Sequence, residues 1–315
     1  MNEYQRHQDA AEGLLKRLWI FQSDRFPLLK TSLLLAIFTS ASISVSAQLS
    51  GRELPHFSIF LSIWFVTLII FFQMRVCDEW KDLEDDRKYR PERPVPSGLI
   101  SLQTLFSIAF AGVVIALGLT MNLNQWLVIP LVIVWLWLGF MTFEFFAPDW
   151  LKKHQLIYLI SHMMIMPLID LFITASEWLT YGVEPPAYLW LFLILSFVNG
   201  CVLEIGRKIW APESEKIGVD SYSALWGFRK AIVIWVGCCF VSWVFLLLVG
   251  FSTDHPVLTA LPGLIIFFFV VFSAYKFTQT PNKKNEKLIE NVAGMWVFAC
   301  YCLAGFSPLL SGVLL

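Results

Sequence analysis

Long apolar segments alternate with short polar ones along the whole chain. Nine segments have roughly the 20 apolar residues that an α-helix needs to cross a membrane. They lie at about 28–48, 56–77, 101–121, 125–146, 156–176, 187–206, 229–250, 257–278 and 291–312. The pattern predicts an all-α, polytopic membrane protein with nine transmembrane helices.

The first 27 residues differ from the rest. They are polar or amphipathic and lack the apolar core of a cleavable signal peptide. We expect a short arm at 1–27 that lies as a helix on the membrane surface, followed by one transmembrane domain at 28–315.

Composition excludes a soluble protein. Hydrophobic residues make up 57% of the chain and charged residues only 15%, too few to cover a soluble surface. The six cysteines lie within or at the ends of apolar segments, so we expect reduced thiols that pack as small apolar groups.

The distribution of positive charge predicts the orientation. If the N-terminus is cytoplasmic, Arg52 is the only one of the 23 Lys and Arg residues on the outer side. Two charge-rich loops, after the second and sixth segments, then share the cytoplasmic face. For a bacterial protein this would be the inner membrane.

The first charge-rich loop, residues 75–98, reads RVCDEWKDLEDDRKYRPERPVPSG. If the preceding helix continues through Asp86, then Asp78, Asp82 and Asp86 stack on one face, about 6 Å apart. Their mutual repulsion would be relieved by Mg²⁺, which binds carboxylate oxygens together with substrate phosphate oxygens. The alternative is an ordinary solvated loop beside the membrane.

The second charge-rich loop, residues 204–227, combines acidic and basic side chains. Glu204, Arg207 and Lys208 come at a helix end, and Glu213 and Glu215 follow. Carboxylates with Arg and Lys suit a polyanion bound with a divalent metal. No phosphate-binding glycine loop is present, so the pattern favours a diphosphate on a lipid-soluble tail over a nucleotide. Aromatic helices would shield and stabilise a carbocation left by the departing diphosphate.

These motifs resemble those of the UbiA-type intramembrane prenyltransferases. That family has Asn-x3-Asp-x3-Asp after its second helix and then Arg-Pro-apolar-Pro-Ser-Gly, similar to Asp78–Asp86 and Arg93–Gly98 here. Its nine helices and second acidic motif extend the resemblance over most of the chain, and Arg25 with Pro27 resembles the opening of its first helix. The resemblance implies Mg²⁺-dependent transfer of a prenyl group from a prenyl diphosphate to a lipid-soluble acceptor, aromatic or otherwise. It implies no nucleic acid, and no protein partner is evident.

The chain also departs from the family pattern. Asp78 stands where the family usually has Asn, and Glu204 with Lys208 stands where it has Asp-x3-Asp. A lysine cannot bind Mg²⁺. The second metal is therefore either replaced by the charges of Arg207 and Lys208 or held by Glu213 and Glu215.

The expected site follows from both lines of reasoning. The expected metal ligands are Asp78, Asp82, Asp86 and Glu213, and the expected catalytic residues are the three aspartates with Arg207 and Lys208. The expected substrate contacts are Arg25, Lys88, Arg93, Glu204, Tyr222, Tyr158, His162 and Asp170. Lys88 and Arg93 could instead contact lipid headgroups, and Tyr222 could simply pack in a turn.

Tyr158, His162 and Asp170 lie within the fifth apolar segment. Ionisable groups inside a membrane are costly and point to function, so Asp170 could orient an acceptor or stabilise a cation. The alternative is a hydrogen-bonded interior role.

Three other functions remain open. A terpene cyclase of the same fold would ionise a prenyl diphosphate without an acceptor. A transporter usually places charge near the middle of the membrane, whereas most charge here lies at one face. A scaffold protein that has lost catalysis would tolerate the altered second motif.

Overall fold

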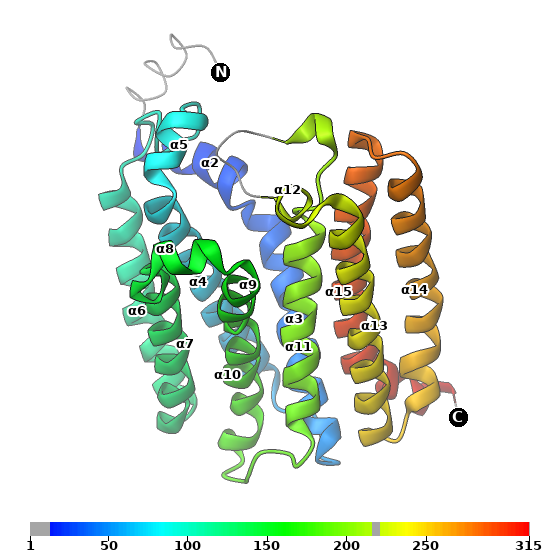
Figure 1. The fold of residues 1–315 in the computed structure, drawn as a ribbon. Coiled ribbons are helices and arrows are strands. Elements are labelled where there is room, and N and C mark those ends of the chain that lie inside the picture. The colour runs from blue at the N-terminus through cyan, green and yellow to red at the C-terminus, as the bar shows by residue number, and fades with distance from the viewer. Residues whose placement is uncertain (1–12, 216–220, 315) are drawn as a thin grey trace.

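The computed structural model describes residues 13–215 and 221–314, and this part of the chain is a bundle of helices (Figure 1). Nine of the described helical stretches are long and apolar enough to cross a membrane. They are α3 (Leu28–Leu49), α4 (Phe57–Lys81), α6 (Leu102–Leu123), η1 with α7 (Gln125–Leu127 and Val128–Thr142), α9 with α10 (Gln155–Met163 and Ile165–Thr180), α11 (Leu189–Gly206), α13 (Phe228–Ser252), α14 (Pro256–Gln279) and α15 (Lys283–Leu314). The predicted all-α membrane fold is confirmed.

Short helices gather at one end of the bundle. They are α2 (Leu14–Arg25), α5 (Leu83–Tyr89), α8 (Pro148–Lys153) and α12 (Tyr222–Trp226), with the 3₁₀ turns η2 (Glu144–Phe146) and η3 (Pro212–Ser214). We call the end that carries α5 and α12 the motif end (Figure 1). The described parts of the two charge-rich loops therefore lie at the same end of the bundle. That this end faces the cytoplasm stays a prediction, as does the membrane-surface position of the arm.

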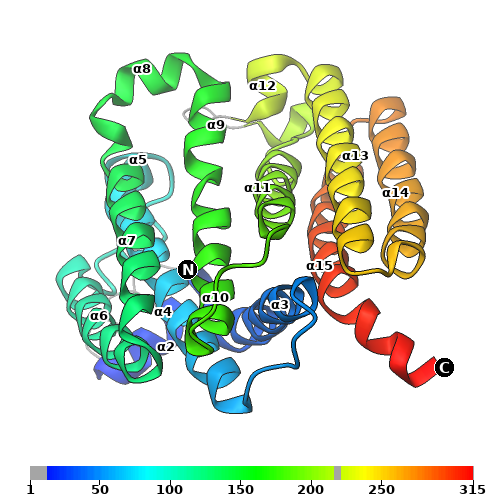
Figure 2. The same ribbon diagram turned by 90° about the horizontal axis from the view of Figure 1, so that it is seen from below.

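The long helices enclose a shared apolar core. α3 packs against α4, α10 and α15, and α11 packs against α10, α13 and α15 (Figure 2). Trp235, Trp296, Phe172 and Phe192 are among the largest fully buried side chains. All six cysteines are reduced thiols, as expected.

Small residues allow the closest helix contact. A Cβ added to Gly305 of α15 would lie 2.5 Å from the Cα of Ala41 in α3. The side chain of Gln48 also donates to the Gly305 carbonyl at 2.7 Å. Close approach through glycine is a common way for helices to associate in membranes.

Three spans differ from their predicted bounds. The fifth span is broken at Met164 because Pro167 has no N–H to donate to the carbonyl of Met163. The fourth ends at Thr142, where a left-handed turn begins, and not at residue 146. α15 begins at Lys283, eight residues before the predicted start, because its first turns are charged and hydropathy does not detect them.

The only basic residue predicted on the outer side has a buried partner. Arg52 Nε lies 2.6 Å from one Glu177 oxygen, Arg52 Nη2 lies 2.8 Å from the other, and Ser46 also donates to Glu177. Glu177 is fully buried at the end of α10. This pair ties the loop after α3 to α10 at the end opposite the motifs.

Candidate functional site

The first acidic motif lies across a helix joint. α4 ends at Lys81, and Asp82, with φ −87° and ψ 2°, connects it to α5. The backbone N–H of Asp82 donates to the Asp78 carbonyl at 2.9 Å, and that of Asp86 donates to the Asp82 carbonyl at 2.8 Å. The backbone thus keeps the four-residue spacing of a helix through the joint.

The three aspartates have different surroundings. Asp78 is exposed and pairs with Arg75 at 2.9 Å. Asp86 is buried, and its two oxygens contact Arg90 at 2.9 Å and Arg93 at 2.6 Å. In the described ranges no hydrogen bond or ion pair engages the Asp82 carboxylate, and desolvation raises its pKa above the usual range. Asp82 is the carboxylate that most needs a cation.

A metal site is not preassembled by these side chains. Among residues 13–215 and 221–314, no three His, Cys, Asp or Glu residues lie close enough to hold a metal ion. The donor chemistry of Asp82 and Asp78 fits Mg²⁺. Coordination by Asp86 would compete with its two arginine contacts.

The second motif brings positive charge to the same place. Glu204, almost buried at the end of α11, contacts Lys208 at 2.9 Å and accepts from Arg207 Nε at 2.6 Å. Desolvation opposes the charge of Arg207, but Glu204 outweighs it and raises the pKa of the guanidinium. Arg207 also interacts electrostatically with Asp78 of α4. The two motifs therefore face each other across the motif end.

Tyr222 belongs to the packing of the second loop. It is 3% exposed, its ring lies 4.5 Å from that of Trp226, and its backbone N–H donates to the Lys208 carbonyl. Burial, helped by the charge of Glu204, raises the pKa of its hydroxyl. Of its two predicted roles, this geometry supports the packing role.

Glu213 and Glu215 are engaged at helix starts. Glu213 Oε1 accepts from the backbone N–H of Lys283 at the start of α15, at 2.7 Å. Glu215 accepts from the Ser221 hydroxyl, at 2.6 Å, just before α12. The part of the motif at 216–220 lies outside the described residues. Of the two options for the second metal, these contacts favour replacement by Arg207 and Lys208, although the metal role of Glu213 is untested.

Three further basic side chains were predicted to contact the substrate: Arg25 of α2 and, in the first charge-rich loop, Lys88 and Arg93. Arg25, at the end of α2, pairs with the buried Glu79 of α4 at 2.6 Å and so fixes α2 to the bundle. Lys88 is exposed, with its ammonium 4.9 Å from the Tyr89 ring. Arg93 is held by Asp86. Of these three side chains, only Arg93 contacts one of the motif aspartates.

Tyr158 and His162 form a cluster with Lys81. The Lys81 ammonium donates to the Tyr158 hydroxyl at 3.0 Å and lies 3.4 Å from His162 Nε2. Because lysine can only donate, Nε2 accepts, and the proton on Nδ1 is directed to the Tyr158 carbonyl, 2.9 Å away. Glu144 Oε1 lies 2.5 Å from the same ammonium. The sequence pattern does not single out Lys81; for Glu144 the available signal is a single acid among phenylalanines after an apolar span.

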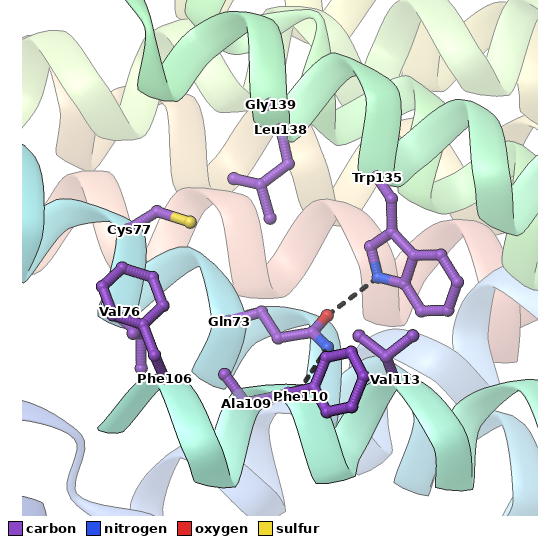
Figure 3. A pocket seen from close by; sticks show the side chains of 10 residues that line it. All are labelled: Gln73, Val76, Cys77, Phe106, Ala109, Phe110, Val113, Trp135, Leu138 and Gly139. Atoms are coloured by element: carbon purple, nitrogen blue, oxygen red, sulfur yellow. Dashed lines mark hydrogen bonds between the residues drawn. The ribbon is translucent and has the colours of Figure 1, made fainter. Parts of the chain in front are cut away.

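A small cavity adjoins this cluster, and a larger groove lies next to the cavity. A small cavity of about 30 Å³ is lined in part by Asp78, Lys81 and His162. A groove of about 280 Å³ lies between α4, α6 and α7. Gln73 lies in this groove (Figure 3), where it accepts a hydrogen bond from the Trp135 indole and donates one to the Ala109 carbonyl. Cys77 and Leu138 line both hollows, so the two adjoin.

Asp170 is a fully buried hydrogen-bond acceptor in the bundle interior. The Ser42 hydroxyl of α3 donates to Oδ1, and the Tyr301 hydroxyl of α15 donates to Oδ2, both at 2.6 Å. The Tyr301 oxygen also lies 3.1 Å from Ser196 of α11. These contacts join helices of the core and supply the interior role that was the alternative to substrate binding.

Comparison with protein families matches residues 36–304 to the UbiA prenyltransferase family. The chain belongs to this family. The predicted resemblance of the chain to the UbiA-type family is thereby confirmed, and the protein is a multi-pass membrane protein of a prenyltransferase family. Among curated proteins compared by sequence, none matches the chain significantly.

Two solved structures share the UbiA fold. One, from work on a digeranylgeranylglyceryl phosphate synthase, is 20% identical and has a TM-score of 0.57; the match covers 88% of this chain and 98% of that one. The other, the apo structure of a UbiA homologue from Aeropyrum pernix K1, is 12% identical and has a TM-score of 0.64; that match covers 83% and 96%. At these identities the likeness shows the fold alone.

Proposed function

We propose that this protein transfers a prenyl group from a prenyl diphosphate to a lipid-soluble acceptor within the membrane, with Mg²⁺. The observation that carries the proposal is the juxtaposition of the two motifs. Asp82 makes no ion pair in the described structure, and Arg207 faces the same end of α4 from α11. Carboxylates on one side and cations on the other suit a metal-bound diphosphate.

Each group then has a defined task. Asp82 and Asp78 would hold Mg²⁺, which supplies charge neutralisation for the diphosphate. Arg207 and Lys208 bind the remaining phosphate oxygens and stabilise the negative charge that develops as the C–O bond breaks. Glu204, which contacts both cations, fixes their positions.

The charges of the second motif favour a single metal. The family has Asp-x3-Asp at this position, whereas Glu204 here forms ion pairs with Arg207 and Lys208. Two fixed positive side chains supply much of the charge of a second Mg²⁺. We further propose that the motif end faces the cytoplasm, since that orientation leaves Arg52 as the only outer cation.

The test uses the purified protein in lipid nanodiscs with Mg²⁺ and prenyl diphosphates of several chain lengths. We expect a prenyl diphosphate with Mg²⁺ to raise the unfolding temperature of the wild-type protein, and Asp82→Asn to abolish this shift. Asp85→Asn is the matched control because Asp85 is an exposed aspartate three residues further along, in the first turn of α5. A shift that survives Asp82→Asn unchanged would contradict the proposal.

The same preparation separates the remaining functions. Release of diphosphate without an acceptor, with a cyclised hydrocarbon in the organic extract, would indicate a terpene cyclase. A protein that neither binds nor ionises the diphosphate would instead fit a transporter or a scaffold. The contacts of Asp170 weaken the transporter reading, because both its oxygens are already engaged by protein hydroxyls.

A further inference from the structure

The turn between α7 and α8 has an unusual backbone. Glu144, Phe145 and Phe146 have φ angles of 50°, 52° and 58°, so three consecutive residues other than glycine are left-handed. L-residues rarely adopt this conformation, and it persists only where surrounding contacts impose it. Here aromatic contacts do so: the Phe145 ring lies 5.3 Å from Trp137, and the Phe146 ring lies 5.9 Å from Phe143. The turn directs Glu144 inward, against Lys81.

Only one of the two Glu144 carboxylate oxygens has a partner among the described residues. One oxygen lies 2.5 Å from the Lys81 ammonium, while the other is buried without a hydrogen-bond partner within the described residues. Buried carboxylate oxygens normally accept hydrogen bonds, and one left without a donor calls for an explanation. A hydroxyl group brought by a ligand would supply the missing donor.

Lys81, which holds one oxygen of Glu144, connects this carboxylate to a small cavity that lies beside an open groove. Lys81 lines the small cavity together with Asp78, and this cavity shares Cys77 and Leu138 with the groove between α4, α6 and α7. The groove is open and mainly apolar, with Phe106, Phe110 and Val113 among its walls (Figure 3). At about 280 Å³ it is nearly twice the size of a cavity of about 150 Å³ that holds benzene.

We propose that Glu144, positioned by Lys81, binds the hydroxyl group of the prenyl acceptor, and that the acceptor's hydrocarbon part lies in the groove between α4, α6 and α7. The acceptor is therefore a lipid-soluble alcohol or phenol. This inference rests on the proposed function. It names the acceptor class and its binding site, both of which the motifs leave open.

The transfer of the prenyl group at this site accounts for every bond and for the proton. The acceptor oxygen forms a bond to C1 of the prenyl group as the bond from C1 to the diphosphate oxygen breaks. The diphosphate leaves with the electron pair, and the acceptor's hydroxyl proton passes to the unpartnered oxygen of Glu144. Lys81 holds the other oxygen of Glu144 and is itself held by Tyr158 and His162. It acts as a positioning residue.

The binding test uses 4-decylphenol carrying a photoreactive diazirine on its alkyl chain, added to the protein in nanodiscs. We expect labelling of peptides that contain residues 73–77, 106–113 and 135–139, and competition by unlabelled 4-decylphenol but not by its methyl ether. Competition by both compounds to the same extent would mean that the groove accepts any lipid chain, and would overturn the proposal.

Two glycines provide matched variants for the groove. Gly139 lines the groove and Gly118 faces outward on α6, and an added Cβ at either meets no atom within 4 Å. We expect Gly139→Leu to reduce labelling at least tenfold and Gly118→Leu to leave it unchanged. Equal labelling of both variants would refute the groove as the site.

The kinetic test uses Glu144→Gln, which keeps the shape and one accepting oxygen. General-base catalysis typically contributes 10²–10⁴-fold, so we expect kcat/KM for 4-decylphenol to fall by about 10²-fold or more. The thermal shift caused by prenyl diphosphate with Mg²⁺ should remain. Unchanged kinetics with Glu144→Gln would overturn the role of Glu144.

The inference can fail separately from the proposed function. Binding of prenyl diphosphate with no labelling of the groove would leave the proposed function standing and remove this acceptor site. Labelling of the groove with no binding of prenyl diphosphate would remove the proposed function, and with it the assignment of the groove ligand as an acceptor.

Discussion

The pair formed by Arg52 and Glu177 allows a quantitative test of the fold far from the site. Glu177 has no solvent exposure, and the arginine contacts both of its oxygens, at 2.6 and 2.8 Å. Arg52→Met keeps most of the side-chain length and removes the charge. Among the described residues, Ser46 would then be the only hydrogen-bond donor to the buried carboxylate.

The expected loss of stability follows from the Glu177 carboxylate, which stays buried without its arginine. Removing one partner of a buried ion pair typically costs about 3–5 kcal/mol, because the remaining charge is uncompensated. We therefore expect Arg52→Met to lower the free energy of unfolding by about that amount, measured by titration with SDS in mixed micelles and followed by far-UV circular dichroism.

A double-mutant cycle tests whether the uncompensated charge of Glu177 causes this loss of stability. If the uncompensated charge is the cause, Arg52→Met combined with Glu177→Gln should recover much of the loss, since no charge is then buried. A cost of about 1 kcal/mol or less for Arg52→Met, typical of an exposed pair, would refute the reasoning.

Two further predictions concern the motif and the core. Desolvation raises the pKa of Asp82 above the ordinary value of 3.8, so the carboxylate takes up a proton at a higher pH than a solvated aspartate and then cannot bind a metal. The thermal shift that prenyl diphosphate with Mg²⁺ causes should therefore weaken on the acid side at a pH above 3.8. In the core, Gly305→Ala should lower stability by about 1–3 kcal/mol through its clash with Ala41. Gly294→Ala in the same helix, where a Cβ meets no atom within 4 Å, should be neutral or stabilising; equal effects in SDS titration would contradict the packing argument.

The site was predictable only in part. The spacing of Asp78, Asp82 and Asp86 is a local property, and the backbone keeps it through the joint at Asp82. The charge on each carboxylate depends on its neighbours. Asp86 is neutralised by two arginines of its own loop, while Asp82 has no such partner in the described chain.

The spacing of residues along the sequence could not predict contacts between distant segments. Glu213, which was predicted as a metal ligand, accepts a hydrogen bond from the start of α15, 70 residues further along the chain. Glu144 meets Lys81 because a left-handed turn, which hydropathy does not detect, redirects the chain after α7.

The sequence by itself determined the membrane fold, the number of spanning segments and the meeting of two charged loops at one end. Hydropathy and charge act on each segment through its direct contact with lipid or water, so they can be read without knowing which helices are neighbours. Only the tertiary structure decided which buried charges are compensated and which are not. That outcome depends on helix packing, which brings Arg52 to Glu177 and Tyr301 to Asp170 but leaves one oxygen of Glu144 without a donor within the described residues.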